Sequence, residues 1–220
     1  MAGKLILLDF WVSPFAQRVK IALAEKGIGF ETKEENLMNK SPLLLKMNPV
    51  KKQILALIHN GKPLCESLII VQYIDEVWND QSPLFPCDPY KRRAQARFWA
   101  DYIDKKIYST GRTLVFIKGE TQEAGKKDLI ECFKVLEAEL GEKTYFGGET
   151  FGIVDIALIP FYNFFHLYKT CGNFSFEEEC PKIVAWGKKC LEKESVSKAL
   201  PDQYKVFDFF MEMAKKIGAQ

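Results

Sequence analysis

The sequence predicts an N-terminal α/β domain, whose mixed four-stranded sheet is covered by helices, followed by an all-helical domain. Strands and helices alternate up to residue 79, whereas beyond residue 88 almost every apolar pattern has a helical period. Between them, residues 80–88 are rich in turn-forming residues, which indicates a linker. The predicted domains are therefore 1–79 and 89–220.

In the first domain, short apolar runs predict the strands, and one longer amphipathic pattern predicts the first helix. Gly27 follows this helix as a stop signal, and Asn60-Gly61 is a strong signal for a tight hairpin. The predicted elements, in order, are a strand over 4–9, a helix over 14–26, a strand near 29–34, a polar loop, strands over 54–58 and 62–65, and a helix that begins at 66–67.

In the second domain, apolar residues at helical spacing predict a long helix that begins at 93. The same spacing predicts four further helices, over 126–140, 152–168, 181–192 and 202–217. The helix at 152–168 has a recognisable start, because Gly152 can cap it and the Asp155 carboxylate can reach back to the backbone. Residues 156–165 are apolar nearly all round, which predicts a central buried helix.

Composition excludes several classes of protein. The net charge of +2, with Lys and Arg scattered along the chain, gives no indication of a nucleic-acid partner. The N-terminal apolar run is too short for a signal peptide, and no stretch approaches the ~18 apolar residues of a membrane span. Six cysteines without a C-x-x-C pair, and two distant histidines, predict free thiols and no metal site. We expect a cytoplasmic protein without a membrane partner.

The stretch Trp11–Arg18 sets a hydroxyl at the start of a helix that directly follows a buried strand. Proline is tolerated at the first helical position, so Pro14 puts Ser13 at the N-cap. The unpaired N–H groups of the first turn and the helix dipole favour negative charge there. A hydroxyl in this place can stabilise an anionic sulfur, although a plain helix cap is the simpler interpretation.

A series of short motifs accompanies Ser13 along nearly the whole chain. Besides residues 11–18, they are Glu34-Glu35-Asn36-Leu37, Asn39-Lys40-Ser41-Pro42, Asn48-Pro49, residues 59–63, Glu66-Ser67-Leu68, Gly147-Gly148 and Asp155-Ile156-Ala157. In order and spacing this series resembles the plant tau-class glutathione S-transferases. The resemblance implies a thioredoxin-like first domain, a homodimer, and conjugation of glutathione to hydrophobic electrophiles in detoxification or stress responses, with glutathione as co-substrate and no further cofactor.

The resemblance gives Ser13 the catalytic role of stabilising the glutathione thiolate, which is the nucleophile. Lowering a thiol pKa by about two units requires about 2.7 kcal/mol. One hydrogen bond to a charged group contributes roughly 1.5–3 kcal/mol, so the hydroxyl and its helix terminus can suffice. Serine cannot act as a redox thiol, which favours conjugation over disulfide chemistry.

Five further residues are implied to bind glutathione. Ser67 and its N–H are expected to hold the γ-glutamyl carboxylate at the start of a helix, while Glu66 takes the α-amino group. Lys40 and the position of Gln53 are expected at the glycyl carboxylate, and the Ile54 backbone at the cysteinyl segment. Without the resemblance, Ser67 and Glu66 are a helix cap with an acidic first turn. Lys40 is then a solvated loop lysine, and the Ile54 side chain belongs to the core.

The electrophile site is expected between the domains, where ligand pockets often form. Its candidate residues are Phe10, Trp11, Phe15, Leu37, Tyr108, Arg112, Phe164 and Phe210. Aromatic residues at helical spacing more often belong to a core than to a binding site. In the implied homodimer, Arg92, Arg93 and Arg97 are candidates to meet acidic residues of the second copy, Asp75 or Glu76.

One departure from the family concerns Leu55, where the chains it resembles usually have a cis proline. A non-proline cis bond costs roughly 2.5–4 kcal/mol, against about 0.5–1 kcal/mol before proline. We therefore predict a trans bond between Ile54 and Leu55. Gln53 likewise replaces a cation that relatives offer to glutathione. These departures leave open a non-catalytic binder of apolar ligands on the same scaffold, and a glutathione peroxidase is a third alternative.

Overall fold

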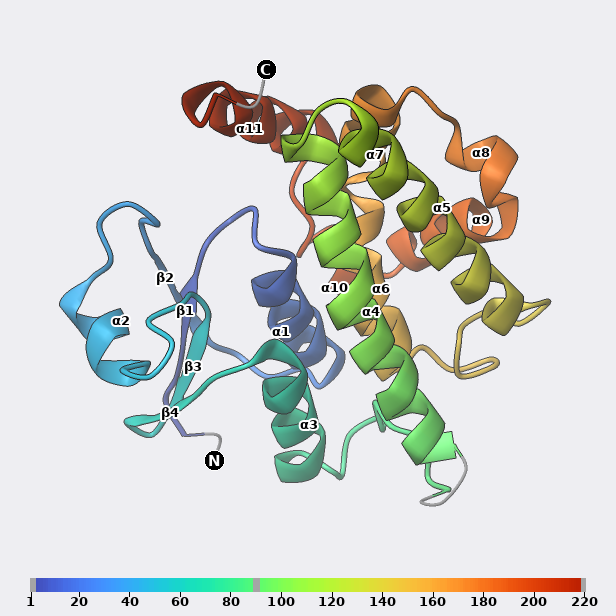
Figure 1. The fold of residues 1–220 in the computed structure, drawn as a ribbon. Coiled ribbons are helices and arrows are strands. Elements are labelled where there is room, and N and C mark those ends of the chain that lie inside the picture. The colour runs from blue at the N-terminus through green and yellow to red at the C-terminus, as the bar shows by residue number, and fades with distance from the viewer. Residues whose placement is uncertain (1–2, 89–91, 219–220) are drawn as a thin grey trace. The chain divides into compact units, whose positions relative to one another are not determined.

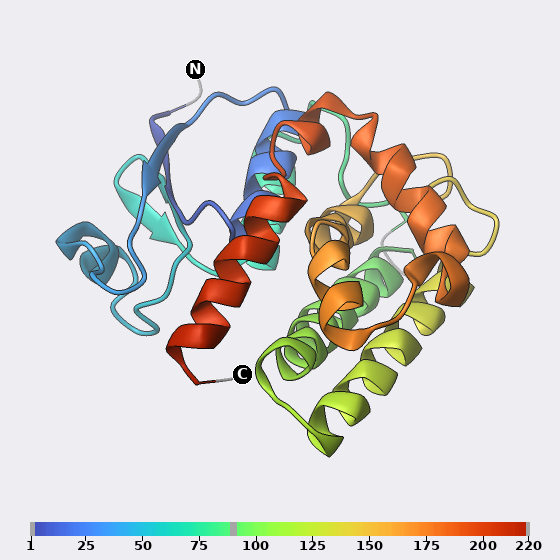
Figure 2. The same cartoon turned by 90° about the horizontal axis from the view of Figure 1, so that it is seen from above.

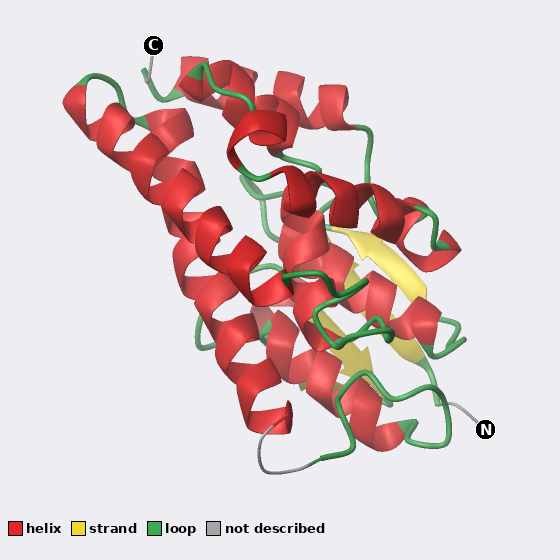
Figure 3. Ribbon diagram, turned by 90° about the vertical axis from the view of Figure 1, so that its right-hand side faces the viewer, coloured by secondary structure: helices red, strands yellow, loops and turns green. Residues whose placement is uncertain are grey.

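A computed structural model describes residues 3–88 and 92–218 of the chain. The chain divides into two compact units, Met1–Leu84 and Phe85–Gln220. All four strands of the described residues belong to the first unit, and the elements of the second are helices (Figures 1 and 3). The predicted fold class, a mixed four-stranded sheet with helices followed by an all-helical part, is confirmed.

The first unit is built on a sheet with the strand order β2-β1-β3-β4. Its elements are β1 (Leu5–Asp9), α1 (Pro14–Glu25), β2 (Glu31–Glu34), α2 (Pro42–Met47), β3 (Ala56–His59), β4 (Lys62–Leu64) and α3 (Ser67–Val77). β2 runs parallel to β1, whereas β3 is antiparallel to both β1 and β4. A parallel neighbour requires a crossover, and α1 supplies it.

Helices cover both faces of this sheet. α1 and α3 pack against each other on one face, and α2 lies on the other (Figures 1 and 2). On the α2 side, Leu44 packs into a buried cluster with Leu8, Ala56 and Ile58. Side chains alternate between the two faces of a strand, so the neighbouring Leu57 is buried on the α1 side. α2 has only six residues and lies in the stretch predicted as loop, because so short a helix shows no periodicity.

The hairpin between β3 and β4 has the turn that the sequence predicts. Asn60 and Gly61 both have positive φ, 51° and 78°, and they connect residues paired as His59 with Lys62. Two consecutive positive φ values define the tight turn that Asn-Gly favours. Gly27, with φ of 64°, likewise follows the end of α1 as predicted.

A buried ion pair joins the C-terminal end of α1 to α3. The Lys26 Nζ lies 2.8 Å from the Asp75 Oδ1, and both side chains are buried. The same carboxylate accepts a hydrogen bond from the Leu84 N–H at 2.8 Å. Asp75 is therefore engaged within its own chain, and its expected contact with an arginine of a second copy stays a prediction. Its neighbour Glu76 is exposed, and the side chain of Arg92 lies outside the described residues.

The peptide bond between Ile54 and Leu55 is cis, so the predicted trans bond is wrong. The predicted trans bond follows from the free energy of an isolated peptide, in which a cis bond before a residue other than proline is disfavoured. In the folded chain, the Asn48 side-chain amide donates a hydrogen bond to the Gln53 carbonyl oxygen at 2.9 Å, and the Leu55 side chain is buried. The tertiary surroundings of a segment can fix a conformation that its local sequence disfavours.

The second unit is helical. Its elements are α4 (Arg92–Phe116), α5 (Glu120–Leu140), α6 (Ile153–Tyr162), α7 (Phe165–Gly172), α8 (Phe176–Glu179), α9 (Pro181–Leu191), α10 (Glu194–Ser197) and α11 (Gln203–Lys216). The long helices α4 and α5 pack side by side, and α6 packs against α4 and α9 (Figures 1 and 3). A Cβ on Gly125 of α5 would lie 2.8 Å from the Thr113 Cγ2 of α4, so this glycine permits the close approach.

Two predicted helices differ from the structure. α5 begins at Glu120 rather than 126, because its polar first turn and Gly125 hide the helical pattern. The helix predicted over 152–168 is two helices, α6 and α7. Pro160 has no backbone donor to extend the hydrogen-bond ladder, and α6 ends two residues later. The short helices α8 and α10 have too few residues to show a period.

Asp155 holds the start of α6, as the sequence predicts. Its carboxylate accepts hydrogen bonds from the Gly152 N–H (3.0 Å), the Phe146 N–H (3.0 Å) and the Trp186 Nε1 (2.8 Å). Residues 153–161 are all buried, which confirms the central helix. One buried carboxylate thus connects α6, α9 and the loop before α6.

Within residues 3–88 and 92–218, no helix combines the length and the apolar character that crossing a membrane requires. In the same part of the chain, no three His, Cys, Asp or Glu side chains come together as a metal site would need.

Asp155 generates a pH prediction for stability. Burial raises its pKa to about 6, although its hydrogen bonds act in the opposite direction. The folded state therefore binds this proton more tightly than the unfolded state, and the contribution to stability falls as the pH rises from about 4 to 6. We expect the stability advantage of the native chain over Asp155→Asn to shrink by up to about 3 kcal/mol across this range.

Urea unfolding followed by tryptophan fluorescence, with both proteins measured at each pH, checks this expectation. Comparing the two proteins cancels the groups that titrate equally in both. An advantage that stays constant or grows with pH would contradict the role assigned to Asp155.

Candidate functional site

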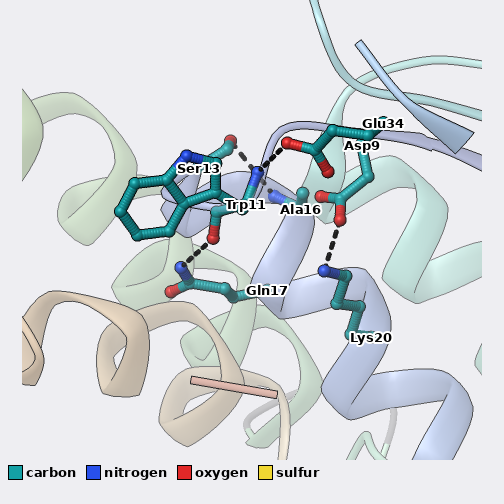
Figure 4. A network of polar contacts seen from close by, with 7 residues as sticks. All are labelled: Asp9, Trp11, Ser13, Ala16, Gln17, Lys20 and Glu34. Atoms are coloured by element: carbon teal, nitrogen blue, oxygen red, sulfur yellow. Dashed lines mark hydrogen bonds and ion pairs between the residues drawn. The ribbon is translucent and has the colours of Figure 1, made fainter. Parts of the chain in front are cut away.

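Ser13 caps the N-terminal end of α1, where the chain leaves the buried strand β1 (Figure 4). Its N–H donates to the Phe10 carbonyl oxygen at 2.8 Å, which closes the turn between strand and helix. Its Oγ accepts a hydrogen bond from the Ala16 N–H at 3.4 Å. Because the oxygen is the acceptor in this contact, the hydroxyl hydrogen remains available for donation to an anion.

Charged and polar side chains surround the Ser13 turn (Figure 4). The Trp11 N–H donates to the Glu34 Oε1 at 2.8 Å, and the Gln17 Nε2 donates to the Trp11 carbonyl oxygen at 3.4 Å. Asp9, at the end of β1, is 1% exposed and forms an ion pair with the Lys20 Nζ. Lys20 thereby neutralises the one buried carboxylate of β1.

Ser67 begins α3, the second helix whose N-terminal end belongs to the predicted site. It is buried, and its Oγ accepts a hydrogen bond from the Arg18 Nη1 at 3.0 Å. Arg18 is fully buried in α1, with its guanidinium carbon 5.2 Å from the centre of the Phe15 ring. The serine hydrogen is again left for donation, and the arginine adds positive charge where a carboxylate is expected.

Sequence reasoning missed Arg18, although it ends the stretch that contains Ser13. Its signal is its place among buried residues of α1, next to Gln17 and Val19. A charged residue is seldom fully buried unless it is paired. A cation on the buried side of an amphipathic helix therefore indicates an anionic or polar partner, here Ser67.

Glu66 stands at the N-cap of α3 with a positive φ of 70°. Its side chain is half exposed, and its Oε1 lies 2.9 Å from the Lys51 Nζ. Since the pair is on the surface, it is weak and open to exchange with another cation. The Glu66 carboxylate is thus accessible to an ammonium group, and its expected role at the α-amino group of glutathione stays a prediction.

Cys65 directly precedes Glu66 in the chain. Its burial raises its pKa, and the Glu66 carboxylate raises it further, although Lys51 acts in the opposite direction. Cys65 is therefore a poor nucleophile at neutral pH.

The remaining predicted ligands of glutathione lie on the segments before and after α2. Lys40 is half buried and precedes Ser41, the N-cap of α2, whose Oγ accepts from the Leu44 N–H at 3.0 Å. The Gln53 side chain is exposed. Ile54 is half buried and packs against the cluster of β1, β3 and α2.

The residues predicted at the electrophile site are divided between the two units. In the first unit, Phe10, Trp11 and Phe15 are half buried and Leu37 is exposed. In the second unit, Arg112 lies over the rings of Tyr108 and Phe116, at 5.8 and 5.9 Å.

The helical unit brings its predicted residues together. The Phe210 ring of α11 lies 5.3 Å from Phe164 and 6.1 Å from Phe116. Sequence reasoning missed Phe116, which connects the two halves of this cluster. Residues 108, 112 and 116 are spaced four apart on one face of α4, so the helical period was a sufficient signal.

Comparisons with known proteins agree along the whole chain. Residues 3–76 match the family described as glutathione S-transferase, N-terminal domain, and residues 119–186 match its C-terminal domain. A probable glutathione S-transferase of tobacco, Nicotiana tabacum, named parC, is 63% identical over 99% of this chain and 98% of its own length.

Two solved structures are similar in sequence and fold. The rice enzyme GST1, in complex with glutathione, is 47% identical, with a TM-score of 0.95 over 98% of both chains. A tau-class glutathione S-transferase of mango, Mangifera indica, is 38% identical, with a TM-score of 0.88 over 94% of this chain and 96% of its own. The chain belongs to the glutathione S-transferase family, and within it to the tau class of plants.

Proposed function

We propose that this glutathione S-transferase conjugates glutathione to hydrophobic electrophiles through a thiolate that Ser13 stabilises. The observation that carries the proposal is the geometry of Ser13, whose oxygen accepts the Ala16 N–H and whose hydrogen is left for an anion. A serine hydroxyl and a helix N-terminus both favour the charged form of a sulfur in front of them.

In the proposed reaction, the thiol proton leaves to solvent and the thiolate sulfur attacks an electrophilic carbon. With an aryl halide, a carbon–sulfur bond forms, the carbon–halogen bond breaks, and halide departs with the electron pair of that bond. The reaction needs no redox partner, and we propose no cofactor besides glutathione as co-substrate and no metal ion.

The other residues are proposed to bind the ends of glutathione. Ser67, supported by Arg18, holds the γ-glutamyl carboxylate, and Glu66 holds the α-amino group. Lys40 and Gln53 lie at the glycyl carboxylate, and the Ile54 backbone at the cysteinyl segment. Support comes from the chemistry of the second helix terminus, where the Arg18 guanidinium is already in contact with the Ser67 hydroxyl.

Each unit carries side chains that we propose as candidates for binding the electrophile. Tyr108, Arg112, Phe116, Phe164 and Phe210 form a connected cluster in the helical unit. Phe10, Trp11, Phe15 and Leu37 are proposed to contribute from the first unit. Such a surface suits aryl halides, unsaturated carbonyls and organic hydroperoxides, which fits a role in detoxification or stress responses.

We also propose that the enzyme is a cytoplasmic homodimer. The six cysteines are all free, as a reducing compartment requires. Large apolar side chains are exposed in both units, among them Ile69 and Val77 of α3 and Phe98 of α4. Exposed apolar surface of this kind often marks a protein interface.

The proposed role of Ser13 is tested by Ser13→Ala, assayed by conjugation of glutathione to a chlorinated nitrobenzene. We expect the rate at pH 6.5 to fall at least about tenfold, because one hydrogen bond to the thiolate is lost. Ser175→Ala is the matched control, since Ser175 also caps a helix, at 3.3 Å from the Glu178 N–H, outside the candidate site. Equal rates in native and Ser13→Ala proteins would contradict the proposal.

Gln53 generates a prediction about affinity. Because a cation at this position faces the proposed glycyl carboxylate, Gln53→Lys should lower the KM for glutathione by about threefold and leave kcat unchanged. Initial rates at varied glutathione concentration measure both, with Gln53→Met as the uncharged control. A KM that stays the same or rises in the lysine variant would remove Gln53 from the proposed site.

The homodimer is tested by light scattering after chromatography. We expect the native protein to have twice the mass of one chain. In Phe98→Glu, the measured mass should shift towards that of the monomer, because the dimer would bury an unpaired charge. Ile217→Glu is the control, because Ile217 and Phe98 are similarly exposed, 61% and 60%. A native protein with the mass of one chain would refute the dimer.

A further inference from the structure

Two consecutive glutamates at the end of β2 contact two different loops of the candidate site. Glu34 accepts the Trp11 N–H through Oε1 at 2.8 Å, in the turn that leads to Ser13. Glu35 accepts the Ser41 N–H through Oε2 at 3.1 Å and the Ser41 hydroxyl through Oε1 at 2.6 Å. Ser41 directly follows Lys40. The two glutamates therefore contact both the turn that leads to Ser13 and the segment that carries Lys40.

The end of β2 is well placed to hold both loops. In the parallel register, Glu34 pairs with Asp9, the last residue of β1, and the Glu35 N–H donates to the Asp9 carbonyl oxygen at 2.8 Å. Consecutive residues of an extended chain point in opposite directions, which explains why the two side chains reach different loops. Glu34 is exposed, whereas Glu35 is 6% exposed.

The segment between Glu35 and Ser41 is also fixed internally. Asn36 Oδ1 accepts hydrogen bonds from the Met38 N–H at 2.8 Å and the Asn39 N–H at 3.3 Å, which shapes the turn before Lys40. At the other end, Ser41 caps α2. The position of Lys40 thus depends on Glu35 through two hydrogen bonds to the next residue.

We propose that Glu34 and Glu35 are positioning residues that set the two halves of the glutathione site separately. Glu34 holds the Trp11 backbone and with it the Ser13 hydroxyl, so it acts on ionisation of the thiol. Glu35 holds Ser41 and with it Lys40, so it acts on glutathione affinity. The inference rests on the roles proposed above for Ser13 and Lys40.

Substitutions of the two glutamates should therefore change different kinetic quantities, the pH profile for Glu34 and the KM for glutathione for Glu35. In Glu34→Ala, we expect the pH profile of the conjugation rate to move upward and the rate at pH 6.5 to fall about tenfold, with an unchanged KM for glutathione. Glu34→Gln retains an acceptor for the Trp11 N–H and should restore the native profile. In Glu35→Ala, the KM should rise about tenfold with an unchanged pH profile.

Glu31→Ala is the matched control, because Glu31 lies on the same strand and forms ion pairs with Lys4 and Lys33, at 3.5 and 3.8 Å. It should leave both kinetic parameters native. Glu35→Gln, which can satisfy only part of the Ser41 contacts, should give a smaller rise in KM, and it carries the test if Glu35→Ala does not fold.

Glutamate variants that melt earlier but keep native kinetics would overturn the inference, as would variants that change KM and pH profile together. Ser13→Ala and Lys40→Ala, measured in the same assay, separate this failure from failure of the proposed function. If they shift the pH profile and the KM respectively while the glutamate variants do not, only the positioning role is lost. If Ser13→Ala keeps the native profile, the proposed role of Ser13 fails and the inference for Glu34 fails with it.

Discussion

The N-terminal end of α1 is the constraint on which the candidate site depends. A helix that begins where a buried strand ends presents backbone N–H groups that have no partner within the helix. Ser13 accepts a hydrogen bond from one of them, Ala16, and its own hydroxyl hydrogen is left available for donation. The parallel pairing of β1 with β2 and the packing of α1 on the sheet determine where this terminus lies. We propose that the fold thereby favours ionisation of a thiol in front of this helix terminus.

Two buried cations, one within α1 and one at its C-terminal end, fix this helix against α3. Arg18 donates to Ser67, and Lys26 pairs with Asp75, the first near the start of α3 and the second near its end. A buried charge without a partner is costly, so each contact disfavours sliding of one helix along the other. The distance between the two helix starts, and hence between Ser13 and Ser67, is therefore set by interactions in the interior. The buried contacts that stabilise the first unit therefore also determine the spacing of the candidate site residues.

Sequence reasoning predicted those features that depend on local chemistry. The Asn60-Gly61 turn, the Ser13 cap and the Gly152–Asp155 helix start each follow from the preferences of neighbouring residues. Features that depend on tertiary contact were missed or wrong. The cis bond before Leu55 is held by its surroundings, the acid Asp75 is occupied by Lys26, and Arg18 reveals its partner only once α3 packs beside α1. Phe116 was predictable from helical spacing and was overlooked.

We propose that the Ser13 hydroxyl lowers the pKa of the glutathione thiol in the bound state. This role of the hydroxyl is tested most directly by titrating the ultraviolet absorption of thiolate in the enzyme–glutathione complex, for the native chain and for Ser13→Ala. We expect the thiol of bound glutathione to have a pKa well below the usual value of about 8.5 in the native protein, and close to that value in the variant. The same low pKa in both proteins would contradict it, and would move the source of ionisation from the hydroxyl to another group of the site.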